Sequence, residues 1–354
     1  ILRLPIFSSS AGWGALFPMP ATPLRRTFSM ERFSVEWLSF SSKKRSAFLG
    51  GFFLPQIRRS LAVFCLFFGI IPLSSPARTA AKSQEFVVAS YNLENYTLRS
   101  GERVRQKSIP AREAIADVVA EAHPDILGVC ELASPEALAD LRERLAERGI
   151  AFLDTEFVNG PDPDRHVALL SRFPIVRRDS VEKVPFELNG LPELVRRGIL
   201  DVTIQVTPNY SLRLVGVHLK SKLPVPEGEA LVRRMEAQLV REHVDGILGE
   251  NPKVQLLVYG DMNETREEAA IHALQGSRGT LKALSELAAQ DANGERWTHY
   301  RQFTDVYSRI DYFFANKALR SVLVPGGARI SQSAQWRKAS DHRLISVLLS
   351  PDRL

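Results

Sequence analysis

The chain has 354 residues, of which 45% are hydrophobic and 24% charged, as in a globular protein without repeats or low-complexity regions. Its formal net charge is +6, but residues 1–83 hold 11 Lys and Arg against 2 Asp and Glu, which leaves 35 and 38 in residues 84–354. The body is therefore slightly acidic, and net charge gives no support for a polyanion substrate. Two cysteines, Cys65 and Cys130, provide neither a disulfide framework nor a thiolate metal site.

The first part of the chain is typical of an export signal. A basic pair precedes an apolar run over residues 61–73, and small residues follow up to Ala81. This is the pattern of a secretory signal, and the run is too short for a stable membrane span. We therefore predict an upstream or disordered extension at residues 1–56, a signal peptide at residues 57–81 and a secreted or periplasmic protein. Because a signal should begin near residue 1, we expect the true start to lie further along, with Met30 as a candidate; a membrane-anchoring helix is the alternative.

Residues 84–354 alternate strand and helix patterns. Short apolar runs indicate strands, and apolar positions three and four residues apart indicate helices. Strands are predicted over residues 85–91, 125–130, 166–171, 175–184, 199–207, 212–218, 255–259, 309–315 and 344–349, and helices over residues 105–122, 135–148, 227–248 and 264–275. The strands on either side of Phe173-Pro174 are expected to pair with each other. Because several strands follow one another directly, a mixed-sheet sandwich with helices outside fits better than a purely parallel sheet.

Polar residues recur where these strands end. Each one alone is an ordinary turn, cap or surface residue. Together they offer oxygen ligands for a hard cation and groups for acid–base chemistry. They are Asn92, Glu131, His218, Asp261, Asn263, Asp311, Asp341 and His342.

The ordered set of motifs resembles the endonuclease/exonuclease/phosphatase superfamily, the deoxyribonuclease I-like phosphohydrolases. The resemblance covers about residues 84–350 and implies an α/β (α+β) fold, a four-layer sandwich of two mixed β-sheets flanked by helices. It also implies metal-dependent cleavage of a phosphate ester by water, with Mg²⁺ as the ion and Mn²⁺ or Ca²⁺ as alternatives. We expect a monomer. The motifs are Tyr91-Asn92-Leu93-Glu94, Val129-Cys130-Glu131, Ala168-Leu169-Leu170-Ser171-Arg172-Phe173-Pro174-Ile175, Val217-His218-Leu219-Lys220-Ser221-Lys222, Gly260-Asp261-Met262-Asn263, Arg309-Ile310-Asp311-Tyr312 and Ser340-Asp341-His342.

The resemblance assigns metal binding first to Glu131, which is similar to the carboxylate that holds the catalytic ion in this family. Asn92 matches an asparagine near the metal and the phosphate, and Asp341 matches a second carboxylate on the metal side. Glu94 falls where some members place another acidic ligand. A hard cation with oxygen ligands neutralises phosphate charge and polarises the P–O bond.

The resemblance also implies the catalytic groups. Asp261 and Asn263 are similar to the pair that positions the attacking water and binds the transition state. His342 resembles the general base or phosphate-binding histidine, and Asp311 resembles the carboxylate that fixes its tautomer. His218 resembles the histidine that protonates the leaving oxygen in deoxyribonuclease I and the neutral sphingomyelinases.

His218 also argues against the branch of the superfamily that is similar to abasic-site endonucleases, because those members have a tyrosine in this region. The carboxylate that partners this histidine in deoxyribonuclease I has no secure counterpart here, where Arg165-His166 falls near its place. Lys220 and Arg197 are candidates for phosphate contact, and a solvated basic loop is the alternative for them.

Three functions remain open from the sequence. The favoured one is an exported Mg²⁺-dependent nuclease, endonuclease or exonuclease, or another phosphodiesterase. The second is the same chemistry on a lipid or sugar phosphate, as in sphingomyelinases and inositol phosphatases, with residues 186–191 as a modest candidate for an apolar membrane-contacting hairpin. The third is a catalytically silent binding module, against which the intact site residues argue.

Overall fold

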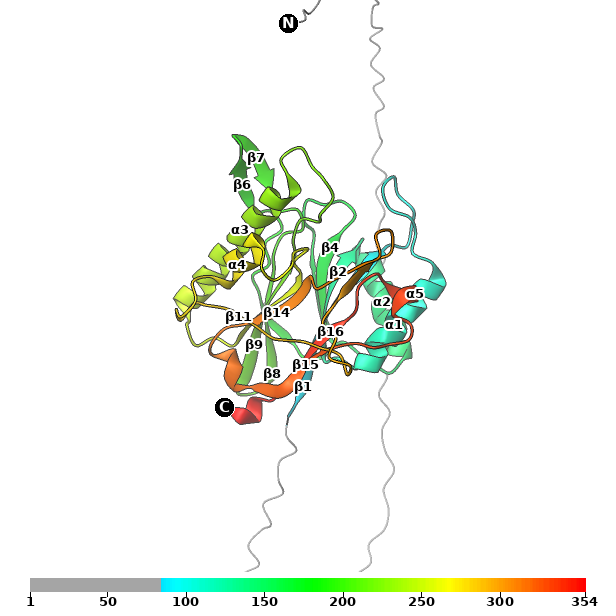
Figure 1. Cartoon of the computed structure of the whole chain (residues 1–354). Helices are drawn as coiled ribbons and strands as arrows, with labels where there is room; N and C mark the ends of the chain where they lie inside the picture. Colours follow the sequence, from blue (N-terminus) through cyan, green and yellow to red (C-terminus); the bar gives the residue numbers. More distant parts are fainter. Residues whose placement is uncertain (1–83) are drawn as a thin grey trace, which may run out of the picture. The chain divides into compact units, whose positions relative to one another are not determined.

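The computed structural model describes residues 84–354, which form two six-stranded sheets packed face to face (Figure 1). The predicted extension and signal peptide lie outside the described residues. Sheet A has the strand order β15 (Leu323–Ile330), β16 (Ile345–Leu349), β1 (Phe86–Tyr96), β2 (Ile126–Leu132), β4 (His166–Ser171) and β3 (Asp154–Val158). Sheet B has the order β11 (Ser285–Glu286), β14 (Asp311–Ala315), β10 (Leu256–Asp261), β9 (Tyr210–His218), β8 (Leu200–Thr207) and β5 (Ile175–Arg178). The pairs β1–β2 and β9–β10 are parallel among antiparallel neighbours, so both sheets are mixed as predicted.

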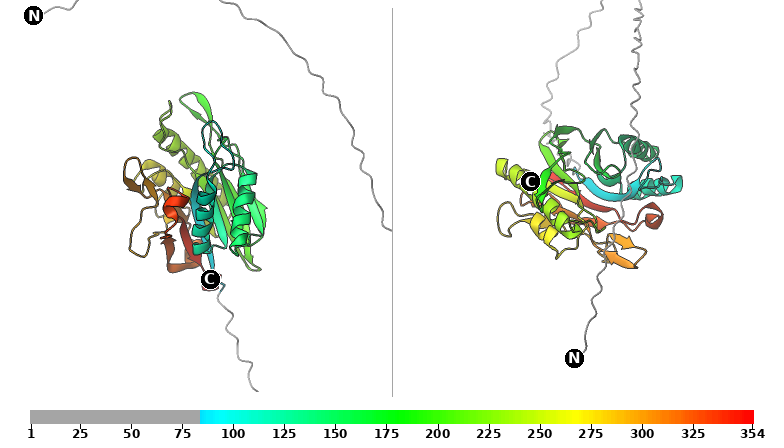
Figure 2. Two further views of the ribbon diagram at one scale, coloured as in Figure 1. Left: turned by 90° about the vertical axis from the view of Figure 1, so that its right-hand side faces the viewer. Right: turned by 90° about the horizontal axis from the view of Figure 1, so that it is seen from above.

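Helices cover the outer faces of both sheets, which gives the predicted four layers (Figures 1 and 2). On sheet A lie α1 (Ile109–Ala122), α2 (Pro135–Glu147) and the short α5 (Trp336–Ala339). On sheet B lie α3 (Glu229–Glu250) and α4 (Ala269–Gln275). The short 3-10 turns Leu319–Ser321 and Pro351–Arg353 complete the helical elements. None of the helices in residues 84–354 is long and apolar enough to cross a membrane.

The core between the sheets is mostly apolar and includes the side chain of Tyr259 of β10. Its ring packs directly against Gly128 of β2, where an added methyl group would overlap the ring. Its hydroxyl occupies the space that a side chain at position 216 of β9, a glycine, would need. Because interiors are close-packed, these two glycines fix how Tyr259 sits between the sheets. The ring therefore holds sheet B in one position against sheet A.

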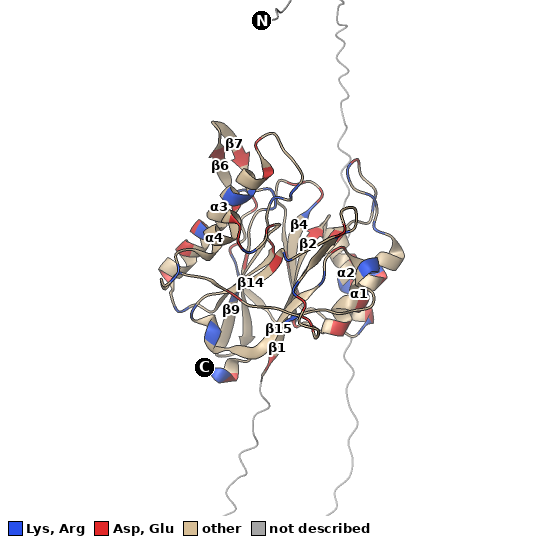
Figure 3. Ribbon diagram, viewed as in Figure 1, with Lys and Arg blue, Asp and Glu red and all other residues tan. Residues whose placement is uncertain are grey.

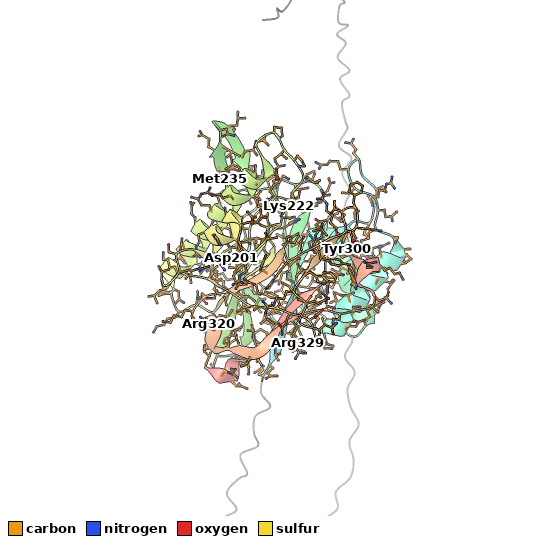
Figure 4. The ribbon with its side chains drawn as sticks, viewed as in Figure 1. Asp201, Lys222, Met235, Tyr300, Arg320 and Arg329 are labelled. Carbon is orange, nitrogen blue, oxygen red and sulfur yellow. The ribbon has the colours of Figure 1, made fainter. Side chains whose placement is uncertain are left out.

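Charged residues of both signs alternate over the helices and loops (Figure 3). One ionic cluster is buried under α3. Asp201 of β8, labelled in Figure 4, accepts hydrogen bonds from Arg213 of β9 at 2.6 and 2.8 Å and lies 2.7 Å from Nε2 of His243. This cluster ties sheet B to its covering helix.

Several predicted elements differ from the structure. The strand predicted over residues 175–184 ends at Arg178, and the helix predicted from residue 105 begins at Ile109. The strands on either side of Phe173-Pro174 do not pair: β4 belongs to sheet A and β5 to sheet B, so this turn carries the chain from one sheet to the other. Periodicity reports that a segment is a strand but not which sheet it joins. The helix predicted from residue 264 begins only at Ala269, and the Glu264 carboxylate before it is paired with Arg233 of α3 at 2.6 and 2.8 Å.

Two short hairpins add to the sheets. One is β6 (Pro185–Leu188) with β7 (Leu191–Leu194), which contains the segment 186–191 and projects beyond the sheets beside α3 (Figure 1). The other is β12 (His299–Arg301) with β13 (Val306–Ser308). The second hairpin was not predicted, nor were β3, β11, β15 and α5. The β12–β13 hairpin contacts the segment just before β16 through a bridge between His299 and His342.

Candidate active site

The predicted polar residues meet where the ends of the two sheets face each other. Asn92 of β1 and Glu131 of β2 come from sheet A, whereas His218 of β9, Asp261 of β10 and Asp311 of β14 come from sheet B. Parallel neighbours place their carboxyl ends at one edge, where α/β sheets bind ligands. Asn92 Nδ2 donates to Asp261 Oδ2 at 2.9 Å, so a direct hydrogen bond joins the two sheets inside the site.

Several backbone positions at this edge adopt the left-handed region, which is uncommon for residues other than glycine. Glu131 has φ 61° and Asn263 has φ 50°. Glu131 is also a bulge, since its two neighbours in β2 pair with adjacent residues of β4. Gly260, at φ 136°, has no room for a side chain beside the carbonyl of Val217. The strain is concentrated at the residues that present the polar groups, as is usual for functional sites.

Asp261 lies at the centre of these groups. Its Oδ1 accepts the Asn263 backbone N–H at 2.7 Å, and its Oδ2 accepts from Asn92. The Nε2 atoms of His218 and His342 each lie 3.7 Å from Asp261 Oδ2. A buried carboxylate with two histidine nitrogens near the same oxygen is well placed to orient a water molecule.

His342 and Asp311 form a close pair, with 2.8 Å between Nδ1 and Oδ2. Each member is anchored by a hydroxyl from another segment. Thr298 Oγ1 accepts the Asp311 N–H at 3.1 Å, and Ser340 Oγ accepts the His342 N–H at 3.1 Å while donating to the Asn92 carbonyl at 2.8 Å. The Asp311 carboxylate therefore accepts a hydrogen bond from Nδ1–H of His342, and Nε2 of His342 lies 3.7 Å from Asp261 Oδ2.

The surroundings shift the pKa values of these groups in opposite directions. Burial alone would lower the pKa of His342, but the carboxylates of Asp311 and Asp261 raise it well above its ordinary value. Burial, with Asp311 nearby, raises the pKa of Asp261 to about 7. Burial lowers the pKa of His218 well below its ordinary value, and the charge of Arg197 adds to the effect. Before ligands bind, these surroundings favour a protonated His342 and a neutral His218.

Both ring nitrogens of the buried His218 lack a hydrogen-bond partner among the described residues. Its Nε2 lies 3.7 Å from Asp261 and 3.8 Å from Glu131, beyond hydrogen-bonding distance. Buried polar atoms normally have partners, so an additional polar group beside Nε2 would complete the bonding of this side chain.

A pocket of about 520 Å³ opens over these groups. Its floor includes the predicted residues Glu131, Asp261, Asn263, Asp341 and His342, and its walls include the segment 221–223 and the β12–β13 hairpin. A larger hollow of about 640 Å³ lies beside the β6–β7 hairpin, but its lining is rich in proline and contains no histidine. The smaller pocket is therefore the candidate active site.

Glu94 lies beside this pocket rather than in it. Its carboxylate is 3.3 Å from the ammonium group of Lys107, which also donates to the Glu94 carbonyl at 2.9 Å. Burial raises the pKa of Glu94, and the Asp341 carboxylate raises it further. Burial alone would raise the pKa of Asp341, but the neighbouring His299 holds it below its ordinary value. Lys107 and His299 were missed from the sequence. Lys107 falls in the helix predicted over residues 105–122 but precedes α1, and His299 lies in a strand of three residues, too short to show a pattern.

The structure does not bring Lys220 and Arg197 to the pocket. The ammonium group of Lys220 donates to the carbonyls of Ser221 and Leu223 at 2.8 and 2.7 Å. Arg197 pairs with Asp162 at 3.1 Å. Both basic side chains are buried, so this arrangement supports neither the predicted phosphate contacts nor the alternative of a solvated loop.

The donor set fits a hard divalent cation. Glu131, Asp261 and Asp341 offer carboxylate oxygens in one pocket, with the Asn92 amide beside them, and Mg²⁺, Mn²⁺ and Ca²⁺ prefer such ligands. Asn92 Nδ2 lies 3.4 Å from Glu131 Oε1, so the amide and the carboxylate are neighbours. Two groups of three side chains in residues 84–354 place their ligand atoms within 4.8 Å of one another: His299, Asp341 and His342, and Asp261, Asp311 and His342.

Comparisons with known proteins agree with this fold. A sequence model of the Endonuclease/Exonuclease/phosphatase family matches residues 89–342, more than two thirds of the chain. Truncated TDP2 from Caenorhabditis elegans is 18% identical with a TM-score of 0.53, covering 75% of this chain and 98% of its own. Sphingomyelinase C from Streptomyces griseocarneus is 15% identical with a TM-score of 0.54, covering 75% and 99%. An endonuclease/exonuclease/phosphatase family protein from Leptotrichia buccalis is 15% identical with a TM-score of 0.53, covering 74% and 98%. None of the curated proteins compared with the chain by sequence matches it.

Proposed function

The chain belongs to the endonuclease/exonuclease/phosphatase family of metal-dependent phosphoesterases, and from this premise we propose that it hydrolyses phosphodiester bonds of nucleic acid. The observation that carries the proposal is the Asp311–His342 pair, with Nε2 of His342 and Nε2 of the unpartnered His218 each 3.7 Å from Asp261 Oδ2. Two histidines beside one buried carboxylate supply a group for each side of an in-line displacement: one toward the attacking water and one toward the leaving oxygen.

In this proposal Asp261 and Asn263 orient the attacking water. Asp311 holds the imidazole of His342 so that its Nε2 accepts a proton from this water. His218 donates a proton to the leaving oxygen. A phosphate beside His218 adds negative charge, which raises its pKa and favours the protonated form that an acid requires. The carboxylate of Asp311 becomes more favourable to His342 as that ring gains its proton, so the pair stabilises the transition state more than the ground state.

Glu131 and Asp341, with Asn92 and Asp261 beside them, would hold the divalent cation, for which we propose Mg²⁺. When bound, such an ion neutralises charge on the phosphate and also opposes the protonation of His342, which favours the neutral imidazole that a base requires.

A second candidate substrate is a phosphodiester in a lipid surface. Phe303, at the turn of the β12–β13 hairpin, is 96% exposed, and Leu223 and Val306 are exposed on the walls of the pocket. Exposed apolar side chains around an active site suit contact with lipid. The segment 186–191 is less suited to membrane contact than the sequence indicated, because its Leu188 side chain is buried.

The test is hydrolysis of bis(p-nitrophenyl) phosphate by the full chain with Mg²⁺, Mn²⁺ or Ca²⁺. Asp261→Ala and His342→Ala should each reduce kcat by about 10²- to 10⁴-fold. His243→Ala, which changes a histidine outside the pocket, is the control. Hydrolysis that persists in EDTA would contradict the metal assignment, and native rates in both site variants would contradict the site.

Substrate class is tested separately with plasmid DNA, RNA, sphingomyelin vesicles and sugar phosphates. We expect turnover of nucleic acid to exceed that of the other three. Preference for sphingomyelin vesicles would favour the lipid candidate, and binding without turnover of any substrate would favour a silent module.

We also propose that the protein is exported, on the strength of the basic, apolar and small-residue pattern at residues 57–81. Expression in the source cells followed by amino-terminal sequencing should give a mature protein that begins shortly after Ala81. A mature protein that keeps residues 57–81 would refute export by this signal.

A further inference from the structure

The β12–β13 hairpin separates the pocket from a second hollow of about 270 Å³. Successive side chains of a strand point to opposite faces, and this hairpin follows that rule. His299 and Arg301 line the pocket, whereas Tyr300 and Gln302 line the second hollow. Asp341 lines both, so the two spaces meet at a predicted metal ligand.

Flat groups form much of the second hollow, which we name the aromatic hollow (Tyr300, Gln302, Trp336, Arg337, Glu94, Ser340 and Asp341). Tyr300 and Trp336 lie with their ring centroids 6.2 Å apart. The guanidinium carbon of Arg337 lies 4.9 Å from the Tyr300 centroid and 5.2 Å from that of Trp336. In Figure 4, Tyr300 lies on the α5 side of the molecule and Lys222, from the pocket wall, lies nearer the centre.

A phosphodiester carries two substituents, and the site has two spaces that meet where the phosphate would bind. We propose that the aromatic hollow is a nucleobase subsite, which receives the base of a nucleotide attached to the scissile phosphate. Bases stack on aromatic rings and on guanidinium planes, and the Gln302 amide can donate to and accept from a base edge. This inference rests on the proposed phosphodiesterase function and names the part of the substrate that the hollow selects.

The charge at the ring faces distinguishes a base from a lipid headgroup, because the two carboxylates of the hollow already have basic partners: Glu94 lies 3.3 Å from Lys107 Nζ, and Asp341 lies 3.6 Å from His299 Nε2. A quaternary ammonium ion binds over the faces of aromatic rings because the ring electrons attract a cation. Here the guanidinium of Arg337 already lies over Tyr300 and Trp336, so it repels a second cation at those faces. A neutral base meets no such repulsion. Because Arg337 lies over both rings and is itself exposed, the base would stack on the guanidinium plane that these rings support.

The experiment compares two substrates that share a leaving group: thymidine 5′-(p-nitrophenyl phosphate) and methyl p-nitrophenyl phosphate. In the full chain, Trp336→Ala should lower kcat/KM for the nucleotide about 10-fold more than for the methyl ester, since stacking of one base contributes about 1–3 kcal/mol. Trp336→Phe, which keeps an aromatic ring, should retain most of the preference of the unmodified chain for the nucleotide over the methyl ester. Gln302→Ala, an exposed change in the hairpin turn, should lower kcat/KM selectively for the nucleotide even if the tryptophan variant folds poorly.

Phe303→Ala is the matched control, because this aromatic side chain is in the same hairpin but lines neither space. It should leave the ratio of the two kcat/KM values unchanged. Equal losses on both substrates in Trp336→Ala and Gln302→Ala would overturn the base subsite while leaving the phosphodiesterase function intact. No metal-dependent hydrolysis of either substrate by the unmodified chain would instead refute the proposed function. If Phe303→Ala reduces hydrolysis of sphingomyelin vesicles while the nucleotide ratio stays constant in Trp336→Ala, the hairpin serves a lipid surface and the base subsite is wrong.

Discussion

Replacement of Asp311 by Asn tests the pairing on which the proposed chemistry depends. The Oδ2 atom of Asp311 lies 2.8 Å from His342 Nδ1, and the carboxylate is buried. Asn keeps the size of the side chain and can accept one hydrogen bond, but it carries no charge. Hydrogen bonds to charged groups contribute about 1.5–3 kcal/mol, and each 1.36 kcal/mol is tenfold in rate. We therefore expect kcat/KM for bis(p-nitrophenyl) phosphate to fall about 10- to 100-fold in Asp311→Asn.

The chain offers a matched control in Asp201→Asn. Asp201 is also fully buried and also lies close to a histidine, 2.7 Å from His243 Nε2, but it is outside the pocket. Its replacement should lower the free energy of unfolding and leave kcat/KM of the folded protein unchanged. Both variants are assayed at a temperature where circular dichroism shows them folded. A loss in Asp311→Asn smaller than about twofold, or an equal loss in both variants, would refute the reasoning.

Three further predictions concern stability. Gly128→Ala should lower the free energy of unfolding in urea by about 1–3 kcal/mol, because the added methyl group overlaps the buried Tyr259 ring; Gly246→Ala, in open space on α3, should raise it by about 0.5–1 kcal/mol, and equal effects would contradict this packing. Burial alone would raise the pKa of Asp201, but its histidine and arginine partners hold it below its ordinary value, so this residue stabilises the fold above its unfolded pKa of about 3.9 and stops doing so as pH falls through the lower folded pKa. The thermal midpoint should accordingly fall on acidification over that range, and an equally steep fall in Asp201→Asn would disprove the assignment. Glu236→Gln should cost about 1–3 kcal/mol and reduce hydrolysis, because an amide has one oxygen for the two backbone N–H groups that this carboxylate accepts, one of them just after β9; native stability in urea would argue against it.

The positions of the catalytic candidates were predictable because the signal for each is local. Asn92, Glu131 and Asp261 each stand at the end of a short apolar run, and a buried strand followed by a polar residue is visible in a few residues of sequence. The order of the motifs then indicated the family, and the fold that it implies is confirmed by the two mixed sheets between helices.

The β12–β13 hairpin, which forms one wall of the pocket, was not predictable in this way. β12 and β13 have three residues each, too few for a period of two to be seen, and His299 meets His342 only through tertiary structure. The burial of Lys220 and Arg197 could not be predicted from the sequence for a related reason. A basic residue after a strand usually reaches solvent, but loop carbonyls and Asp162 hold these two inside.

The seating of Tyr259 between Gly128 and Gly216 has a consequence for when the enzyme becomes active. Neither sheet alone carries a complete set of catalytic groups. A nascent chain is therefore inactive until the two sheets have packed together and the Tyr259 ring lies against Gly128 and Gly216. Secondary structure could form early without any hydrolysis, and activity would report the last step of assembly.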